Sequence, residues 1–196
     1  LAFDGYYNDS QNSSLYYLKE LQKYSPKTPF YLVIGPYGHF GTQIGGEAVL
    51  NDYKVDPVSL FDIKKITYEW FDYILKNGAK PEILKNKINY EVMGANEWKS
   101  APSFEKMHNE YLTFYLTPAA SQDFRLADTM KPKKKEFLTQ EVDFANREIS
   151  NNNYYPSPII QKEVNKNDGY FFISEPLTEP LIVNGSFLGE IKLSIN

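Results

Sequence analysis

The feature that most constrains the fold is a short apolar run that ends in a turn rich in glycine and proline. Residues 30–34 read Phe-Tyr-Leu-Val-Ile, and residues 35–39 read Gly-Pro-Tyr-Gly-His. Such runs, bounded by Gly and Pro, are typical of buried strands, and reactive side chains of α/β proteins lie just past the carboxyl ends of these strands. His39 occupies that position. We therefore predict either a general base or a structural hydrogen-bonding histidine there.

A helix and another strand precede this run. Residues 1–11 indicate the end of a strand followed by a polar turn, and the helix begins at Ser13 or Ser14 and is stopped at Pro26. Its apolar face consists of Leu15, Leu18 and Leu21. Residues 1–39 therefore form a β-turn-α-turn-β unit, whose two strands should be parallel neighbours joined by a right-handed crossover.

Polar side chains follow both strands of this unit. Asn8 and Asp9 follow the first strand, and His39 follows the second. Because the carboxyl ends of parallel strands meet at one sheet edge, these side chains should lie within hydrogen-bond reach. A carboxylate that orients a histidine, and a histidine that acts as base, are two members of a nucleophilic triad.

The longest helix is predicted after a polar, glycine-rich loop at residues 42–56. Asp56 is a capping residue, Pro57 suits the first helical turn, and Asn77-Gly78 ends the helix. Residues 88–94 then alternate as a strand should, and residues 95–102 follow as a turn.

A change of composition places a domain boundary near residue 104. From residue 110 to residue 117 the apolar residues recur with period two, which predicts a sheet with one solvated face. Further strands are predicted at residues 169–174, 181–183 and 189–195, with turns at Asp168-Gly169 and Asn184-Gly185. The polar stretch 118–168, with its lysine run at 131–135 and loop tips at 151–153 and 165–168, is predicted to be a solvated loop.

Composition excludes several function classes. A formal net charge of -4 provides no basic field for nucleic acid, and no apolar run is long enough for a transmembrane span, so neither nucleic acid nor a membrane is expected as a partner. The absence of cysteine excludes disulfides and thiolate chemistry, and His39 and His108 are the only imidazoles, so no metal or cofactor is expected. The compartment and the oligomeric state stay open.

Four motifs, in order and in register, resemble a known family. They are residues 5–11 (Gly-Tyr-Tyr-Asn-Asp-Ser-Gln), 34–39 (Ile-Gly-Pro-Tyr-Gly-His), 70–76 (Trp-Phe-Asp-Tyr-Ile-Leu-Lys) and 93–98 (Met-Gly-Ala-Asn-Glu-Trp). The chain resembles the later half of the Xaa-Pro dipeptidyl-peptidase and cocaine-esterase-like family of serine hydrolases, which includes α-amino-acid ester hydrolases and cephalosporin acylases. The resemblance covers most of residues 1–104 and continues more weakly to residue 186.

The resemblance implies an α/β fold in which a hydrolase domain with a Ser-Asp-His triad precedes a jelly-roll domain. Residues 1–104 would be the C-terminal portion of the α/β-hydrolase domain, and residues 105–196 the start of a galactose-binding-like β-sandwich. His39 falls on the family's general base, and Asn8 falls on the family's acid. An amide holds an imidazole but cannot stabilise an imidazolium electrostatically, which costs a serine triad several orders of magnitude in rate. Asp9, the next residue, would take the place of the family's acid if the turn is shifted by one residue.

The nucleophile of such a triad is not found in these residues. No Gly-x-Ser-x-Gly occurs, and Ser186 lies after the histidine, where the family places a strand. The family order therefore implies a serine upstream of Leu1. We expect a segment of a larger serine hydrolase, cut at both ends, acting on a small acyl ester, amide or peptide; a source protein of 22.7 kDa would refute this.

Two other interpretations remain. One is a catalytically silent relative whose β region binds carbohydrate or protein, which the amide at Asn8 and the 16 tyrosines favour. The other is an unrelated sheet-rich binding module. It requires that His39 be buried, satisfied by backbone groups and remote from both Asn8 and Asp9.

Overall fold

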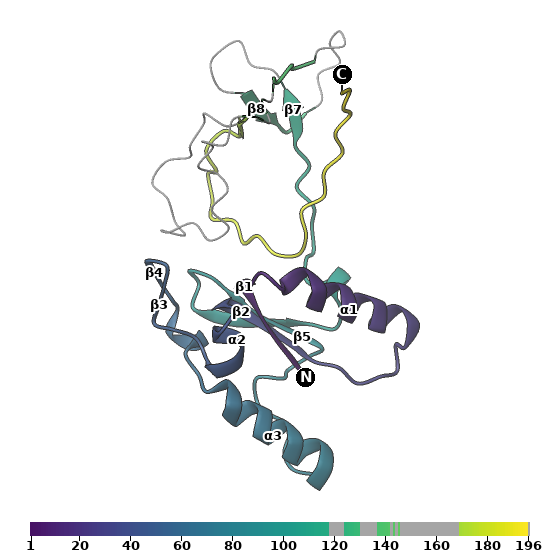
Figure 1. Cartoon of the computed structure of the whole chain (residues 1–196), viewed down its shortest axis with the longest axis vertical. Coiled ribbons are helices and arrows are strands. Elements are labelled where there is room, and N and C mark those ends of the chain that lie inside the picture. Colours follow the sequence, from purple (N-terminus) through teal and green to yellow (C-terminus); the bar gives the residue numbers. More distant parts are fainter. Residues whose placement is uncertain (118–123, 130–136, 142, 144, 146–168, 196) are drawn as a thin grey trace. The chain divides into compact units, whose positions relative to one another are not determined.

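The structure is a computed structural model that describes residues 1–117, 124–129, 137–141, 143, 145 and 169–195 (Figure 1). The chain combines helices with parallel and antiparallel strands, as expected for an α/β protein. It divides into two compact units. One unit consists of Leu1–Asn109 together with Ile182–Asn196, and the other of Glu110–Leu181.

The first unit contains a four-stranded sheet of order β1-β2-β5-β6. Its strands are β1 (Ala2–Tyr7), β2 (Leu32–Gly38), β5 (Ile88–Val92) and β6 (Glu97–Ala101). β2 pairs parallel with both β1 and β5, which confirms the parallel pairing predicted for the first two strands. β6 pairs antiparallel with β5, so the prediction of a turn over residues 95–102 is wrong. Gly94 and Asn96, both at positive φ, reverse the chain early enough for residue 97 to begin a strand.

Helix α1 (Gln11–Tyr24) begins earlier than predicted. Ser10 occupies the N-cap position, because the turn after β1 is closed by a backbone hydrogen bond from Gln11 N to Asn8 O and runs directly into the helix. The helix ends at Tyr24, before Pro26, as expected.

Helix α3 (Ile63–Lys76) begins later than predicted. Asp56 and Pro57 start only a short 3-10 helix, η1 (Pro57–Ser59), and Asp62 is the true cap, since its side chain accepts hydrogen bonds from the first-turn amides of residues 64 and 65. Asn77, in the left-handed conformation at φ 54°, ends the helix where the sequence predicted. The predicted loop before it contains α2 (Gly41–Ile44) and a small hairpin of β3 (Val49–Leu50) and β4 (Tyr53–Lys54).

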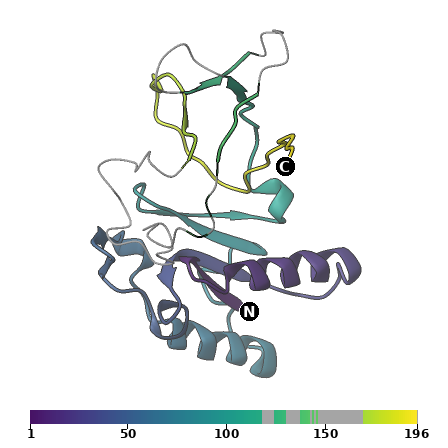
Figure 2. The same ribbon diagram turned by 45° about the horizontal axis from the view of Figure 1, so that its top comes forward.

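The sheet is covered on both faces, and Figure 1 shows α1 and α3 on opposite sides of it. The core on the α1 side consists of Leu18, Phe30, Leu32, Ile34, Ile88, Tyr90 and Ala101. On the other face the buried Tyr37 donates a hydrogen bond to Ser59 O, and Trp98 Nε1 donates one to Val58 O, so two aromatic side chains anchor η1 to the sheet. Figure 2 shows the same arrangement from a second direction.

The second unit contains a three-stranded sheet of order β7-β8-β9. It is formed by β7 (Tyr115–Thr117), β8 (Phe124–Ala127) and β9 (Phe172–Ile173), so two of the predicted strand regions are shorter than expected. β8 pairs antiparallel with β7 and parallel with β9. β8 lies within the stretch 118–168 that was predicted to be a solvated loop, so this prediction is wrong at residues 124–127, where β7 and β9 provide hydrogen-bond partners on both sides. Most of the rest of that stretch, including its lysine run and its loop tips, lies outside the described residues.

The strands predicted at residues 181–183 and 189–195 are not formed. An alternating pattern specifies a strand only where a neighbouring strand provides hydrogen-bond partners, and here none pairs with these described residues. Phe187 and Ile195 are accordingly over nine-tenths exposed. The helices that the structure describes include none with the length and hydropathy to cross a bilayer.

Candidate active site

A close approach of two strands builds the candidate site. The pairing of β1 with β2 shifts register between Gly5 and Tyr7, and a Cβ at Gly5 would lie 1.9 Å from the Tyr37 carbonyl oxygen. Only glycine fits there. Because the strands touch backbone to backbone, the turn after β1 is held against the turn after β2.

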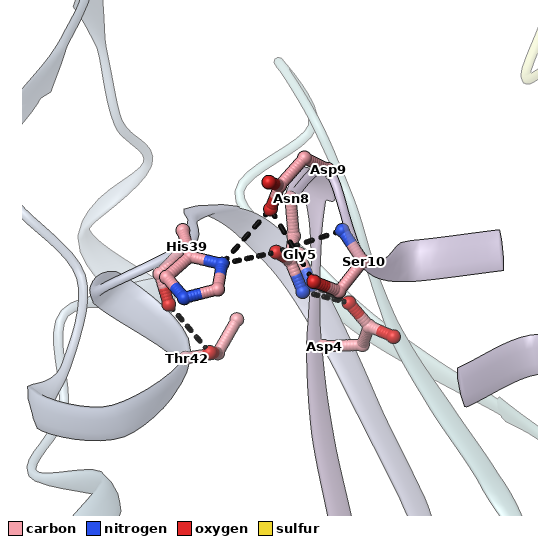
Figure 3. A network of polar contacts seen from close by, with 7 residues as sticks. All are labelled: Asp4, Gly5, Asn8, Asp9, Ser10, His39 and Thr42. Atoms are coloured by element: carbon pink, nitrogen blue, oxygen red, sulfur yellow. Dashed lines mark hydrogen bonds and ion pairs between the residues drawn. The ribbon is translucent and has the colours of Figure 1, made fainter. Parts of the chain in front are cut away.

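The three residues singled out in the sequence meet at this edge. His39 Nδ1 lies 2.9 Å from Asp9 Oδ1 and 3.1 Å from Asn8 Oδ1 (Figure 3). On the far side of the turn, Thr42 Oγ1 donates a hydrogen bond of 2.8 Å to the His39 carbonyl oxygen. The side chain of His39 is 45% exposed and that of Asp9 35% exposed, so the pair is accessible from solvent.

The orientation of the Asn8 amide follows from its other partners. Asn8 Nδ2 donates to Asp4 Oδ1 at 2.8 Å, and the Ser10 backbone amide donates to Asn8 Oδ1 at 3.2 Å. A carboxylate only accepts and an N–H only donates, so the amide oxygen is the atom that faces the imidazole.

This orientation also sets the histidine tautomer. Both atoms near His39 Nδ1 are acceptors, so in the neutral ring Nδ1 carries the proton and Nε2 carries the lone pair. Among the described residues no hydrogen-bond partner of Nε2 is found. The geometry leaves a half-exposed Nε2 able to accept a proton from a hydroxyl or a water molecule.

The charge at the site comes from Asp9. Asn8 contributes an oxygen dipole, whereas Asp9 contributes a carboxylate to the same ring nitrogen. A carboxylate stabilises the imidazolium that forms when a base takes up a proton. The requirement that His39 be buried and remote from both residues, set by the unrelated-module interpretation, is contradicted by these contacts.

Sequence reasoning missed the residues that support this turn. Asp4 is fully buried, although a carboxylate in the strand of a core sheet is rare, and that rarity was the available signal. Gln11 Nε2 donates to Gly5 O at 2.9 Å and ties the start of α1 to the end of β1. No spacing rule would have assigned that contact.

A second carboxyl group is buried on β5. Glu91 is 2% exposed, and burial, together with the nearby Asp56 carboxyl, raises its pKa to about 8. Asp56 Oδ2 accepts a hydrogen bond of 2.6 Å from Gly94 N, which links η1 to the β5–β6 turn. Glu91 is therefore largely protonated at neutral pH.

No serine of the described residues hydrogen-bonds to the His39 side chain, and the described His, Cys, Asp and Glu side chains include no group of three that could hold a metal ion. In comparisons with known proteins, no family model matches the chain and no curated sequence matches it significantly.

Proposed function

We propose that this chain supplies the base half of a serine-hydrolase site. His39 is the general base, Asp9 is the acid that orients and stabilises it, and Asn8 is a second, neutral acceptor. The nucleophilic serine comes from outside these 196 residues, in an α/β-hydrolase domain to which residues 1–104 contribute and which a jelly-roll domain follows. The substrate class is a small acyl ester, amide or peptide.

The observation that carries the proposal is the contact of 2.9 Å between His39 Nδ1 and Asp9 Oδ1 at the carboxyl ends of two adjacent parallel strands. The acid and the base follow these strands in the chain order acid then histidine, which is the order of an α/β-hydrolase triad. The carboxylate is one residue later than the family pattern predicts. The shift of the carboxylate from position 8 to position 9 is compatible with the geometry of the turn, because Asn8 and Asp9 both lie within hydrogen-bond distance of His39 Nδ1.

The proposed proton transfer is simple. His39 Nε2 takes the proton of the serine hydroxyl as the oxygen attacks the acyl carbon, and later returns it to the leaving group. Asp9 stays ionised throughout and stabilises the transient imidazolium. Asn8 Oδ1 shares the Nδ1 proton and limits rotation of the ring.

The second candidate function is a silent relative that binds carbohydrate or protein. Two observations favour it: the acid position of the family holds Asn8, and the Asp9–His39 contact is partly exposed, so solvent weakens it. A silent relative would keep the fold of the turn and would not react with serine-directed reagents.

The test is made on the protein that carries these residues in its source. His39→Gln and the matched control His108→Gln are compared by hydrolysis of p-nitrophenyl butyrate and by labelling with a fluorophosphonate. We expect His39→Gln to lower kcat by at least about 10³-fold and to abolish labelling, because the serine loses its base. His108→Gln should stay within about threefold of the parent.

Two outcomes contradict the proposal. If the parent protein neither hydrolyses the ester nor takes up the fluorophosphonate, the silent relative is favoured. If His39→Gln retains more than a tenth of the parent activity, His39 is not the base.

A further inference from the structure

We propose that Asp4 is a positioning residue that holds the Asn8 side-chain amide with its oxygen toward His39, and so fixes the tautomer of the imidazole. Its consequence for catalysis rests on the proposed function. The positioning itself does not rest on the proposed function, because it concerns only the side chains of Asp4, Asn8 and His39.

Asp4 holds the Asn8 amide by a direct contact. Asp4 is fully buried, and its Oδ1 accepts hydrogen bonds of 2.8 Å from both Gly5 N and Asn8 Nδ2. Because Asp4 Oδ1 is the acceptor of both bonds, the Asn8 amide cannot turn around without placing its own oxygen against that oxygen. In Figure 3 Asn8 accordingly lies between Asp4 and His39.

The stability of the fold does not account for a carboxylate at position 4. Its other oxygen, Oδ2, is buried and has no hydrogen-bond partner within the part of the chain that the structure describes. A buried carboxylate with an unpaired oxygen costs free energy, and the bond that Oδ1 accepts from Gly5 N offsets only part of that cost. A group in such a place calls for another role, and Asn8, its side-chain partner among the described residues, contacts His39.

The two acceptors of the Nδ1 proton differ in how firmly they are held. Asp9 is on the solvent side, where an ion pair holds a side chain weakly. Asn8 is half-buried and anchored from behind by Asp4. When the Asp9 side chain turns to solvent, the hydrogen bonds from Asn8 to Asp4 and from His39 to Asn8 still require a proton on Nδ1 and a lone pair on Nε2.

The experiment measures the tautomer directly. The full chain is labelled with ¹⁵N-histidine, and the ring nitrogen shifts of His39 are read at a pH where the imidazole is neutral, with His108 as the internal reference. The variants are Asp9→Ala, Asp4→Ala and the double variant, so that Asp4 is tested with and without the other acceptor.

We expect Asp9→Ala to keep the Nδ1–H tautomer, and the Asp4→Ala/Asp9→Ala double variant to weaken that preference, because only the bond of 3.2 Å from the exposed Ser10 amide then orients Asn8 Oδ1. Asp4→Asn in the Asp9→Ala background should restore it, because the amide oxygen of Asn replaces the accepting carboxylate oxygen. The proposal is overturned if the folded double variant has the same tautomer ratio as Asp9→Ala. If Asp4→Ala does not fold, Asp4→Leu fills the same space without an acceptor. The tautomer ratio of the Asp4→Leu/Asp9→Ala variant is then compared with that of Asp9→Ala.

This readout separates the two proposals. A tautomer that responds to Asp4 in a protein without His39-dependent hydrolysis would refute the proposed function and leave the positioning role. Hydrolysis that depends on His39, with a tautomer indifferent to Asp4, would refute only the positioning role.

Discussion

The proton on His39 Nδ1 has two acceptors, and only one of them is charged. The site therefore does not depend on a carboxylate at position 8, since the carboxylate of Asp9 reaches the same nitrogen. The amide instead connects the imidazole to the buried Asp4 carboxylate. The negative charge beside the imidazole comes from the residue that follows Asn8.

Glu91 predicts a pH dependence of stability. Its pKa is about 8 in the folded protein, above the ordinary value of 4.5, so between these pH values the folded state holds a proton that the unfolded state releases. The stabilisation is complete below about pH 4.5 and is lost as the pH rises through 8. Glu91→Gln stays neutral, so its free energy of unfolding should exceed that of the parent by on the order of 5 kcal/mol at pH 9.

Urea unfolding at pH 5, 7 and 9 measures this difference. The exposed carboxylate of Glu97, changed to Gln, is the control and should leave the pH slope unchanged. Equal slopes for the parent and Glu91→Gln would show that Glu91 is ionised in the folded protein.

The sequence alone predicted which residues meet at the candidate site, but not which residues hold them in position. His39, Asn8 and Asp9 follow predicted parallel strands, and the geometry of parallel sheets brings strand ends together whatever the side chains are. A carboxylate in a core strand marks Asp4 and Glu91 as unusual, but the pattern says nothing about their partners in three dimensions. Those partners are set by a turn and by packing across the sheet.

At the scale of elements, the parallel pairing of β1 and β2 followed from the alternation of strand and helix, whereas helix starts did not. Asp56 and Asp62 both have the side chain of a cap, and only packing decides between them. The prediction of C-terminal strands is wrong for a related reason. Apolar and polar residues alternate in residues 189–195, but no neighbouring strand pairs with these described residues.

Gly5 is the element-scale test of the site. Alanine there would place a methyl group 1.9 Å from the Tyr37 carbonyl oxygen, which is backbone and cannot move aside alone. We expect Gly5→Ala to lower the free energy of unfolding by about 3 kcal/mol and to separate Asp9 from His39, because β1 must withdraw from β2. Thermal unfolding and the histidine ring shifts measure the two effects.

Gly38 is the matched control, since it belongs to the same strand pair and a Cβ there meets only Leu50 at an ordinary 3.5 Å. Gly38→Ala should change stability by less than about 1 kcal/mol. Similar losses in the two variants would mean that the Gly5 approach is not what holds the strands.

At the scale of the whole molecule, the first unit is discontinuous in sequence. Residues beyond 181 return to it, and Asn184 Nδ2 donates hydrogen bonds to Tyr90 OH and to Met107 O. These bonds fasten the C-terminal segment to β5 and to the chain after η2 (Phe104–Lys106).

Asn184→Ala should lower the free energy of unfolding by about 1–2 kcal/mol, because the Tyr90 hydroxyl and the Met107 carbonyl lose a half-buried donor. Hydrogen exchange should accelerate in residues 104–109. The exposed Ser186, changed to Ala, is the neighbouring control, and it should alter neither stability nor ester hydrolysis. Unchanged exchange in Asn184→Ala would show that the segment is held by other contacts.

The discontinuity of the first unit has a consequence during synthesis. A ribosome presents residues 1–109 well before residue 184, so β1, β2, β5 and β6 can pair, and the Tyr90 hydroxyl can donate to the Met107 carbonyl, before the Asn184 amide is available to either group. Translation at about 5–20 residues per second separates these events by several seconds. The last hydrogen bonds of the first unit are therefore made only after the whole of the second unit has been translated.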